Sequence, residues 1–111
     1  MTYQIRSTPM FDRQFKALYK RYPSLKNDVA RLFAEIQNNP KIGTLLFDDV
    51  YKVRMSITSK NKGKSGGARV IYFNMFAKIA DNDTIIALSI YDKSEHESIT
   101  DKQILDALRN A

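Results

Sequence analysis

The sequence predicts an α+β fold, in which a mainly antiparallel sheet packs against an N-terminal helical hairpin and a short C-terminal helix. Three observations predict it. Apolar residues repeat at helical spacing in the first third of the chain, alternate at strand spacing in the middle, and form a nearly continuous run before a last amphipathic segment. The expected order is strand, helix, helix, three strands and helix, in a single domain over residues 1–111.

The N-terminal third predicts a short strand at residues 2–6 and then two helices. Thr8 is a suitable N-cap, and Pro9 is tolerated at the first helical position. Ser24 is expected to cap the second helix, which ends before Pro40 because proline keeps the preceding residue out of the helical region. Both apolar stripes are interpreted as core faces of an αα-hairpin. They comprise Phe11, Phe15, Leu18, Tyr19 and Tyr22, then Leu25, Val29, Leu32, Phe33 and Ile36.

The middle of the chain predicts strands, because the apolar period changes to two. We expect a loop over residues 41–49 and a half-buried strand over 51–58, whose polar face carries Lys52 and Arg54. Residues 59–68 hold three of the four glycines and are expected to form a flexible loop.

The remaining elements are two strands, a turn and a helix. Residues 69–76 are β-branched and aromatic, and residues 84–91 are apolar enough for a central strand. Residues 79–83 between them are interpreted as a turn. Thr100 and Gln103 form a capping box for the final helix.

The composition excludes several kinds of site. Without cysteine there is no disulfide framework and no cysteine zinc site, and neither glycine-rich nucleotide-binding motif occurs. Two acidic pairs, Asp81 with Asp83 and Asp92 with Glu95, suit a hard cation, but we interpret them as solvated turns and expect neither metal nor cofactor. No apolar run approaches the roughly 20 residues of a membrane helix, so we expect a cytoplasmic protein.

The positive charge is concentrated in one segment. The net charge is +6, and residues 50–80 carry seven basic side chains and no acidic ones, whereas the other 80 residues carry 11 basic and 12 acidic ones. Clustered positive charge favours a polyanionic partner such as nucleic acid, although a membrane surface or an acidic protein would also be attracted.

Four of these cations suit phosphoryl chemistry on RNA. The alternation places Lys52 and Arg54 about 7 Å apart on one strand face. Antiparallel pairing brings Arg69 within reach, and Lys93 follows the last strand. Attack by a ribose 2′-hydroxyl needs a base, an acid and cations for the crowded phosphate. Arginine binds phosphate bidentately, and a lysine crowded by cations can transfer a proton. Strand cations also protect sheet edges, so charge alone indicates a polyanion-binding surface.

Three further lysines and two other side chains are candidates for the same surface. The loop lysines Lys60, Lys62 and Lys64 are expected to bind RNA or the ribosome, although a solvated loop is an equally ordinary interpretation. His96, flanked by two glutamates, is a possible acid but more often an incidental surface residue. Tyr91 stands between a packing role and a site role.

The sequence resembles the RelE/ParE superfamily of toxins, and its HigB-type branch in particular. The resemblance rests on Tyr-Lys-Val-Arg at residues 51–54, the glycine-rich and basic run into Arg-Val-Ile-Tyr-Phe at 63–73, and Ile-Tyr-Asp-Lys-Ser-Glu at 90–95. It extends over nearly the whole chain, with the helical hairpin as its generic part. The expected fold is therefore RelE-like.

The resemblance implies the toxin of a type II toxin–antitoxin system. RelE- and HigB-like members enter the ribosomal A site and cut messenger RNA as mRNA interferases, without metal or cofactor. The implied partners are a cognate antitoxin, the ribosome and mRNA, with operator DNA bound through the antitoxin and no membrane. By position, Lys52, Arg54, Arg69 and Lys93 match catalytic residues.

One departure from the RelE pattern leaves the residue roles open. RelE has a catalytic tyrosine a few residues after the last strand, and the matching place here, near Ile99, holds no tyrosine. Either Tyr91 or His96 takes that role, or the cations act alone. Two other functions stay open: a ParE-like inhibitor of DNA gyrase, and an inactive nucleic-acid-binding module, because a shared fold does not decide function.

Overall fold

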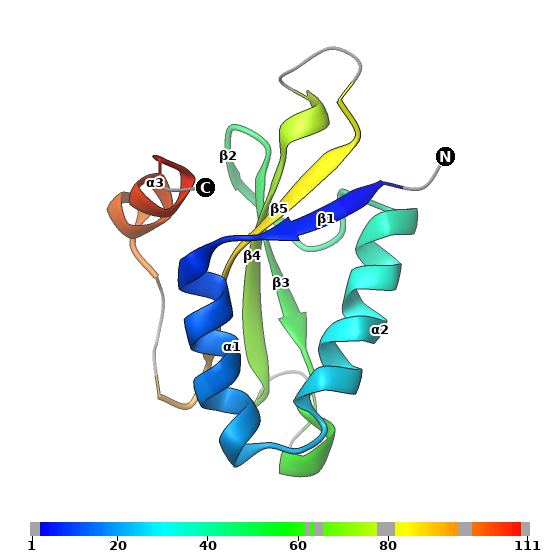
Figure 1. The fold of residues 1–111 in the computed structure, drawn as a ribbon, viewed down its shortest axis with the longest axis vertical. Helices are drawn as coiled ribbons and strands as arrows, with labels where there is room; N and C mark the ends of the chain where they lie inside the picture. Colours follow the sequence, from blue (N-terminus) through cyan, green and yellow to red (C-terminus); the bar gives the residue numbers. More distant parts are fainter. Residues whose placement is uncertain (1–2, 62, 64–65, 78–81, 96–98, 110–111) are drawn as a thin grey trace.

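The centre of the molecule is a five-stranded mixed sheet, which Figure 1 shows in a computed structural model that describes residues 3–61, 63, 66–77, 82–95 and 99–109. The strand order is β1-β5-β4-β3-β2. β1 runs parallel to β5, and the other neighbours are antiparallel. The strands are β1 (Gln4–Ser7), β2 (Thr44–Phe47), β3 (Val50–Met55), β4 (Ala68–Asn74) and β5 (Thr84–Asp92).

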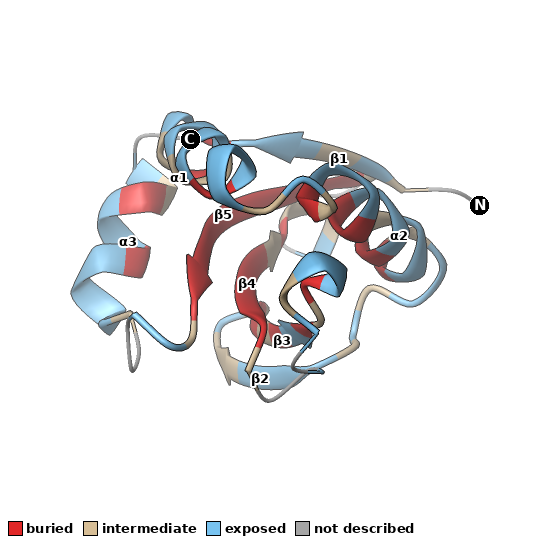
Figure 2. Ribbon diagram, turned by 90° about the horizontal axis from the view of Figure 1, so that it is seen from below, coloured by how far each residue is buried: buried red, intermediate tan, exposed pale blue. Residues whose placement is uncertain are grey.

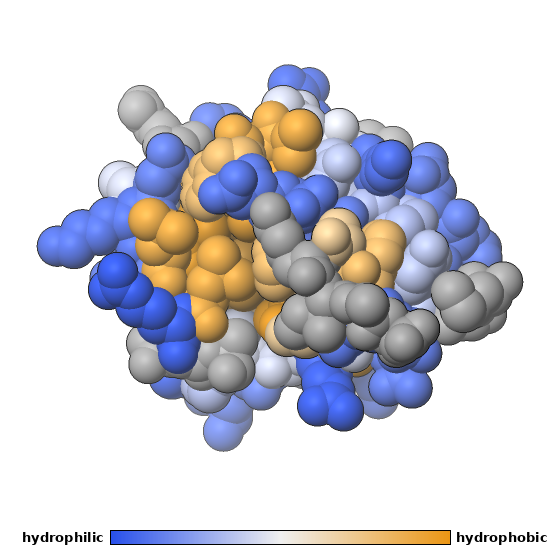
Figure 3. Space-filling model, turned by 90° about the horizontal axis from the view of Figure 1, so that it is seen from above, coloured by the Kyte–Doolittle hydropathy of each residue, from blue (hydrophilic) through white to orange (hydrophobic). Residues whose placement is uncertain are grey.

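Helices cover the two faces of the sheet unequally. The helices α1 (Pro9–Arg21) and α2 (Leu25–Asn38) pack on one face, and the shorter α3 (Asp101–Arg109) packs on the other. The buried residues in Figure 2 lie on the inner sides of these helices and along β4 and β5. Seen from above, the surface of the molecule has apolar side chains gathered left of centre (Figure 3). The predicted fold class is confirmed.

The start of α1 is capped as the sequence predicts, whereas the start of α2 is not. The Thr8 hydroxyl accepts a hydrogen bond from the Phe11 amide at 3.0 Å. Ser24 occupies the N-cap position of α2 but makes no capping bond there. Its hydroxyl donates to the Asp28 carboxylate at 2.8 Å, so the expectation that Ser24 caps the helix is wrong.

Two segments expected to be loops contain regular structure. Within residues 41–49, β2 forms a hairpin with β3 through Asp48 and Asp49, which have φ angles of 39° and 64°. Such positive φ angles match the twist of a tight hairpin, for which glycine or asparagine is the usual signal. Within residues 59–68, a 3₁₀ turn, η1 (Thr58–Lys60), replaces the first part of the flexible loop.

The C-terminal half otherwise follows the expected pattern. The capping box of α3 is present, because the Gln103 amide donates to the Thr100 hydroxyl at 3.2 Å and the Thr100 amide donates to the Gln103 side chain at 2.9 Å. Much of the expected turn at 79–83 lies outside the described residues. Among the helices described, none is long and apolar enough to cross a membrane.

Candidate functional site

The side chains predicted as catalytic meet in one cavity of about 240 Å³. It lies on the α3 face of the sheet, where β3, β4 and β5 run side by side. None of the described residues that line it is acidic. We call it the cationic cavity, and its lining residues are Thr44, Lys52, Arg54, Arg69, Tyr91 and Lys93.

Strand register explains why these residues meet. Arg54 on β3 pairs with Arg69 on β4, and Arg69 pairs in turn with Tyr91 on β5. This row crosses three strands on one face. Lys52 lies two residues before Arg54 on β3, so the period of two brings its side chain to the cavity, whereas Lys93 reaches the cavity from the turn after β5. The sequence correctly predicted that these four cations come together.

Arg69 is the most buried cation of the cavity. It is 6% exposed, and one of its nitrogens (Nη1) donates to the Ala68 carbonyl at 3.1 Å. Burial and the neighbouring Arg54 guanidinium lower the pKa of Arg69, although Tyr91 opposes this. Like charges directly opposite each other on two strands destabilise a sheet by roughly 0.2–1 kcal/mol. An arrangement that costs stability in a cavity makes this cavity a candidate functional site.

Tyr91 is placed for both of the roles between which the sequence did not choose, and a role at the site stays a prediction. It belongs to the apolar cluster under α3, and it also lines the cavity beside Arg69. Burial raises the pKa of Tyr91, while Arg69 and the Ile99 amide oppose the rise. The phenol is therefore protonated at neutral pH and can donate a hydrogen bond. The alternative residue, His96, lies outside the described residues.

The expectation of a mobile, solvent-facing Lys60 is wrong. Its side chain is 9% exposed, and its ammonium lies 2.7 Å from the Asp92 carboxylate at the end of β5. These contacts hold Lys60 inside the fold, away from the cationic cavity. Lys62 and Lys64 lie outside the described residues, so their predicted contacts with RNA or the ribosome stay predictions.

Asp92 is likewise not the solvated turn residue that the sequence suggested. It is 1% exposed. Burial alone would raise the pKa of Asp92, but hydrogen bonds from Lys60, Ser94 and Tyr22 outweigh it and hold the pKa well below its ordinary value. Sequence reasoning missed this partnership because Lys60 and Asp92 are 32 positions apart. Across the described part of the chain, no three His, Cys, Asp or Glu side chains form a group that could hold a metal ion.

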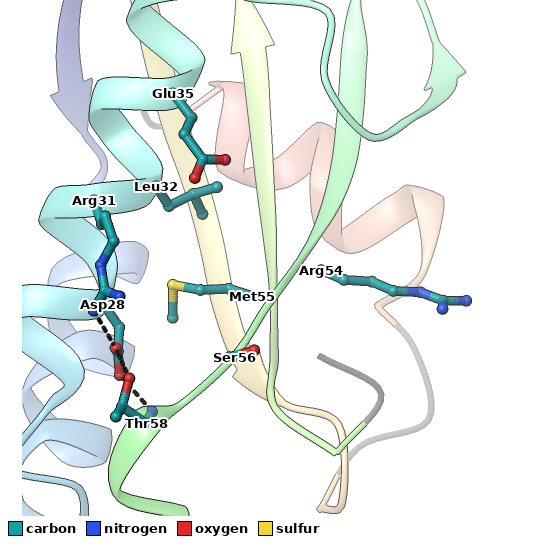
Figure 4. A pocket seen from close by; sticks show the side chains of 8 residues that line it. All are labelled: Asp28, Arg31, Leu32, Glu35, Arg54, Met55, Ser56 and Thr58. Carbon is teal, nitrogen blue, oxygen red and sulfur yellow. Dashed lines mark hydrogen bonds and ion pairs between the residues drawn. The ribbon is translucent and has the colours of Figure 1, made fainter. Parts of the chain in front are cut away.

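A second cavity, of about 130 Å³, lies between α2 and β3 (Figure 4). Among its charged lining residues, Asp28 is buried. The Asp28 carboxylate accepts hydrogen bonds from the Thr58 amide at 2.9 Å, from the Thr58 hydroxyl at 2.6 Å and from Arg31 at 3.1 Å. In Figure 4 the Arg54 guanidinium points away from this group. We therefore interpret Asp28 as the link between α2 and η1, and the cavity as structural.

Comparison with known proteins bears out the fold. No protein-family model matches the sequence. The structure is similar to that of a variant of the E. coli toxin RelE, in which two arginines are replaced by alanine, in the free state. The TM-score is 0.63, over 98% of this chain and 97% of that chain, at 14% sequence identity. The chain therefore has a RelE-like fold.

Proposed function

We propose that this chain is the toxin of a type II toxin–antitoxin pair, of the HigB/RelE-like kind, and cleaves messenger RNA on the ribosome. The observation that carries the proposal is the cavity, in which three cationic side chains (Lys52, Arg54 and Lys93) surround a fourth, the buried Arg69. The RelE-like fold supports it as an analogy.

The proposed reaction is a transesterification within the RNA strand. The ribose 2′-oxygen attacks the adjacent phosphorus, and the bond from phosphorus to the 5′-oxygen of the next nucleotide breaks. The products are a 2′,3′-cyclic phosphate and a 5′-hydroxyl. A base must take the proton of the 2′-hydroxyl, an acid must give one to the leaving oxygen, and cations must stabilise the crowded phosphate.

The residues of the cavity can fill these roles. We assign the stabilisation of the phosphate to Arg69 and Arg54, because guanidinium groups bind phosphate oxygens bidentately and stay charged. We assign proton transfer to Lys52 and Lys93. Tyr91, whose phenol is protonated, donates a hydrogen bond to the reacting phosphate or to a flanking nucleotide.

The proposed partners follow from the same function. A cognate antitoxin would inhibit the toxin and carry the pair to operator DNA, and the free toxin would occupy the A site. We propose Lys62 and Lys64 as contacts with ribosomal RNA. Lys60, whose ammonium bonds within the protein, is not proposed for that role.

The test is cleavage of message on programmed ribosomes, with the 5′ ends mapped. Arg69→Ala should abolish cleavage and leave ribosome binding nearly unchanged, whereas Lys62→Ala with Lys64→Ala should mainly weaken binding. Arg6→Ala, which changes an exposed arginine on β1, is the matched control and should cleave normally.

Three results would contradict the proposal. Intact message while translation stalls would exclude the nuclease. Breaks in DNA that depend on gyrase, with normal message, would favour the ParE-like function. Salt-sensitive binding of RNA without cleavage would favour a binding module.

A further inference from the structure

A buried ion pair lies at the end of the sheet that carries the cationic cavity, but on the opposite face. Lys60 of η1 and Asp92 at the end of β5 are joined at 2.7 Å, with 9% and 0% of their side-chain surfaces exposed. Burying two charges costs free energy that their attraction only partly offsets, so such a pair is weak evidence for stability. Its geometry suggests a different role.

All three donors of the Lys60 ammonium are used. Besides Asp92, it donates to the Gly66 carbonyl and to the Ser94 hydroxyl, each at 3.0 Å. A lysine ammonium has three N–H groups and no acceptor, so these contacts satisfy it completely. Lys60 thereby joins the segment that leads into β4 to the turn that follows β5.

Asp92 is held from both sides as well. Its carboxylate accepts from the Ser94 amide at 2.9 Å and the Ser94 hydroxyl at 2.7 Å, and from the Tyr22 hydroxyl at 3.0 Å. Tyr22 is the C-cap residue of α1. The carboxylate therefore fixes the turn after β5 to both α1 and η1.

We propose that Lys60 and Asp92 are positioning residues, which hold Lys93 at the mouth of the cationic cavity. β5 ends at Asp92, so the anchored Asp92 side chain fixes the start of the turn from which Lys93 reaches the cavity. The Lys93 amide also donates to the Gly67 carbonyl at 3.0 Å, beside the Gly66 carbonyl that Lys60 holds. This role rests on the proposed function of the cavity.

The same turn contains a natural comparison. Glu95 pairs with Arg21, but both side chains are substantially exposed, at 40% and 50%. Exposed pairs contribute little because water screens them and the side chains lose freedom. Glu95→Gln is therefore a control in the same turn, because among the described residues its exposed pair touches the buried network only through the Arg21 side chain, which donates to the Tyr22 hydroxyl.

The first experiment compares cleavage by the wild type, Lys60→Met and Glu95→Gln on programmed ribosomes under single-turnover conditions. A misplacement of about 1 Å in a site can cost roughly 100-fold in rate. We expect Lys60→Met to lose about 100-fold in the maximal rate, with the half-saturating concentration of ribosomes within about twofold of the wild type. Glu95→Gln should match the wild type.

The double variant Lys60→Met with Asp92→Leu separates positioning from stability. An apolar pair in place of a buried ion pair often restores or increases stability. We expect its melting temperature to recover toward that of the wild type while the cleavage rate stays low. A rate that recovers with the melting temperature would overturn the proposal, because the pair would then act through stability alone.

A second experiment does not depend on cleavage. Amide hydrogen exchange, measured by NMR, should speed up at least about tenfold at Lys93 and Ser94 in Lys60→Met and stay unchanged at Ile86 in the sheet, because local opening is distinct from global opening. If Lys60→Met fails to fold, Asp92→Asn gives the same comparison. Unchanged exchange at Lys93 would overturn the positioning role. A wild type that does not cleave would instead overturn the proposed function, and the exchange measurement would still decide the positioning.

Discussion

Arg69→Met is the change that most clearly separates function from stability. The substitution keeps a long, flexible side chain but removes a cation that is 6% exposed and lies directly opposite Arg54. Relief of a like-charged cross-strand pair is worth roughly 0.2–1 kcal/mol. Removal of a buried charge adds to this, while each hydrogen bond that Arg69 loses, such as that to the Ala68 carbonyl, costs about 1 kcal/mol. We expect the free energy of unfolding to stay the same or rise by about 1 kcal/mol.

The assay pairs thermal unfolding with cleavage. For a domain of this size, 1 kcal/mol shifts the melting temperature by about 4 °C, so Arg69→Met should melt between 0 and 4 °C higher than the wild type. Its cleavage rate should fall by at least about 100-fold, as expected when a group that stabilises the transition state is removed. Arg6→Met, on the exposed side of β1, should change neither quantity.

The opposite pattern would contradict these expectations for Arg69. A melting temperature lowered by several degrees in Arg69→Met, with no change in Arg54→Gln, would mean that Arg69 holds the fold together. Cleavage retained by Arg69→Met would remove the arginine from the mechanism.

Three further predictions concern stability. The pKa of Asp92 is lowered in the folded state, so the stability that its carboxylate provides is present above the unfolded pKa of about 4 and is lost as the pH falls. Asp92→Asn should therefore reduce the loss of unfolding free energy below pH 4, measured by urea unfolding at a series of pH values. An unchanged pH dependence would contradict the lowered pKa. Gly67→Ala would place a Cβ 2.1 Å from the Met55 carbonyl oxygen, so it should lower the free energy of unfolding in urea by about 1–3 kcal/mol, whereas Gly63→Asn, at φ +63° with open space, should be nearly neutral. Thr8→Ala removes the cap of α1 and should cost about 1 kcal/mol in the same assay, and a neutral result would show that the cap is replaced by water.

The parts of the fold that depend on local patterns could be predicted from the sequence. The helical stripes, the Thr8 cap and the capping box at Thr100 follow from residues three or four positions apart. The cavity could also be anticipated, because alternation along one strand and pairing with the next are enough to bring Lys52, Arg54 and Arg69 together.

The parts that depend on distant partners could not be predicted. The hairpin of β2 and β3 turns at Asp48 and Asp49, and neither residue is the glycine that usually indicates positive φ angles in a sequence. Lys60 looked like one more loop lysine, because nothing near it in the sequence indicates that Asp92 lies beside it. A buried carboxylate and a buried ammonium each look like surface residues until the fold pairs them.

The chemical nature of the RNA ends distinguishes the proposed transesterification from other routes of cleavage. The proposed mechanism predicts that the purified wild-type chain cuts message in the A site of programmed ribosomes. The upstream fragment should then end in a 2′,3′-cyclic phosphate and the downstream fragment should begin with a 5′-hydroxyl. A downstream fragment that begins with a 5′-phosphate, or a message that stays intact, would contradict it.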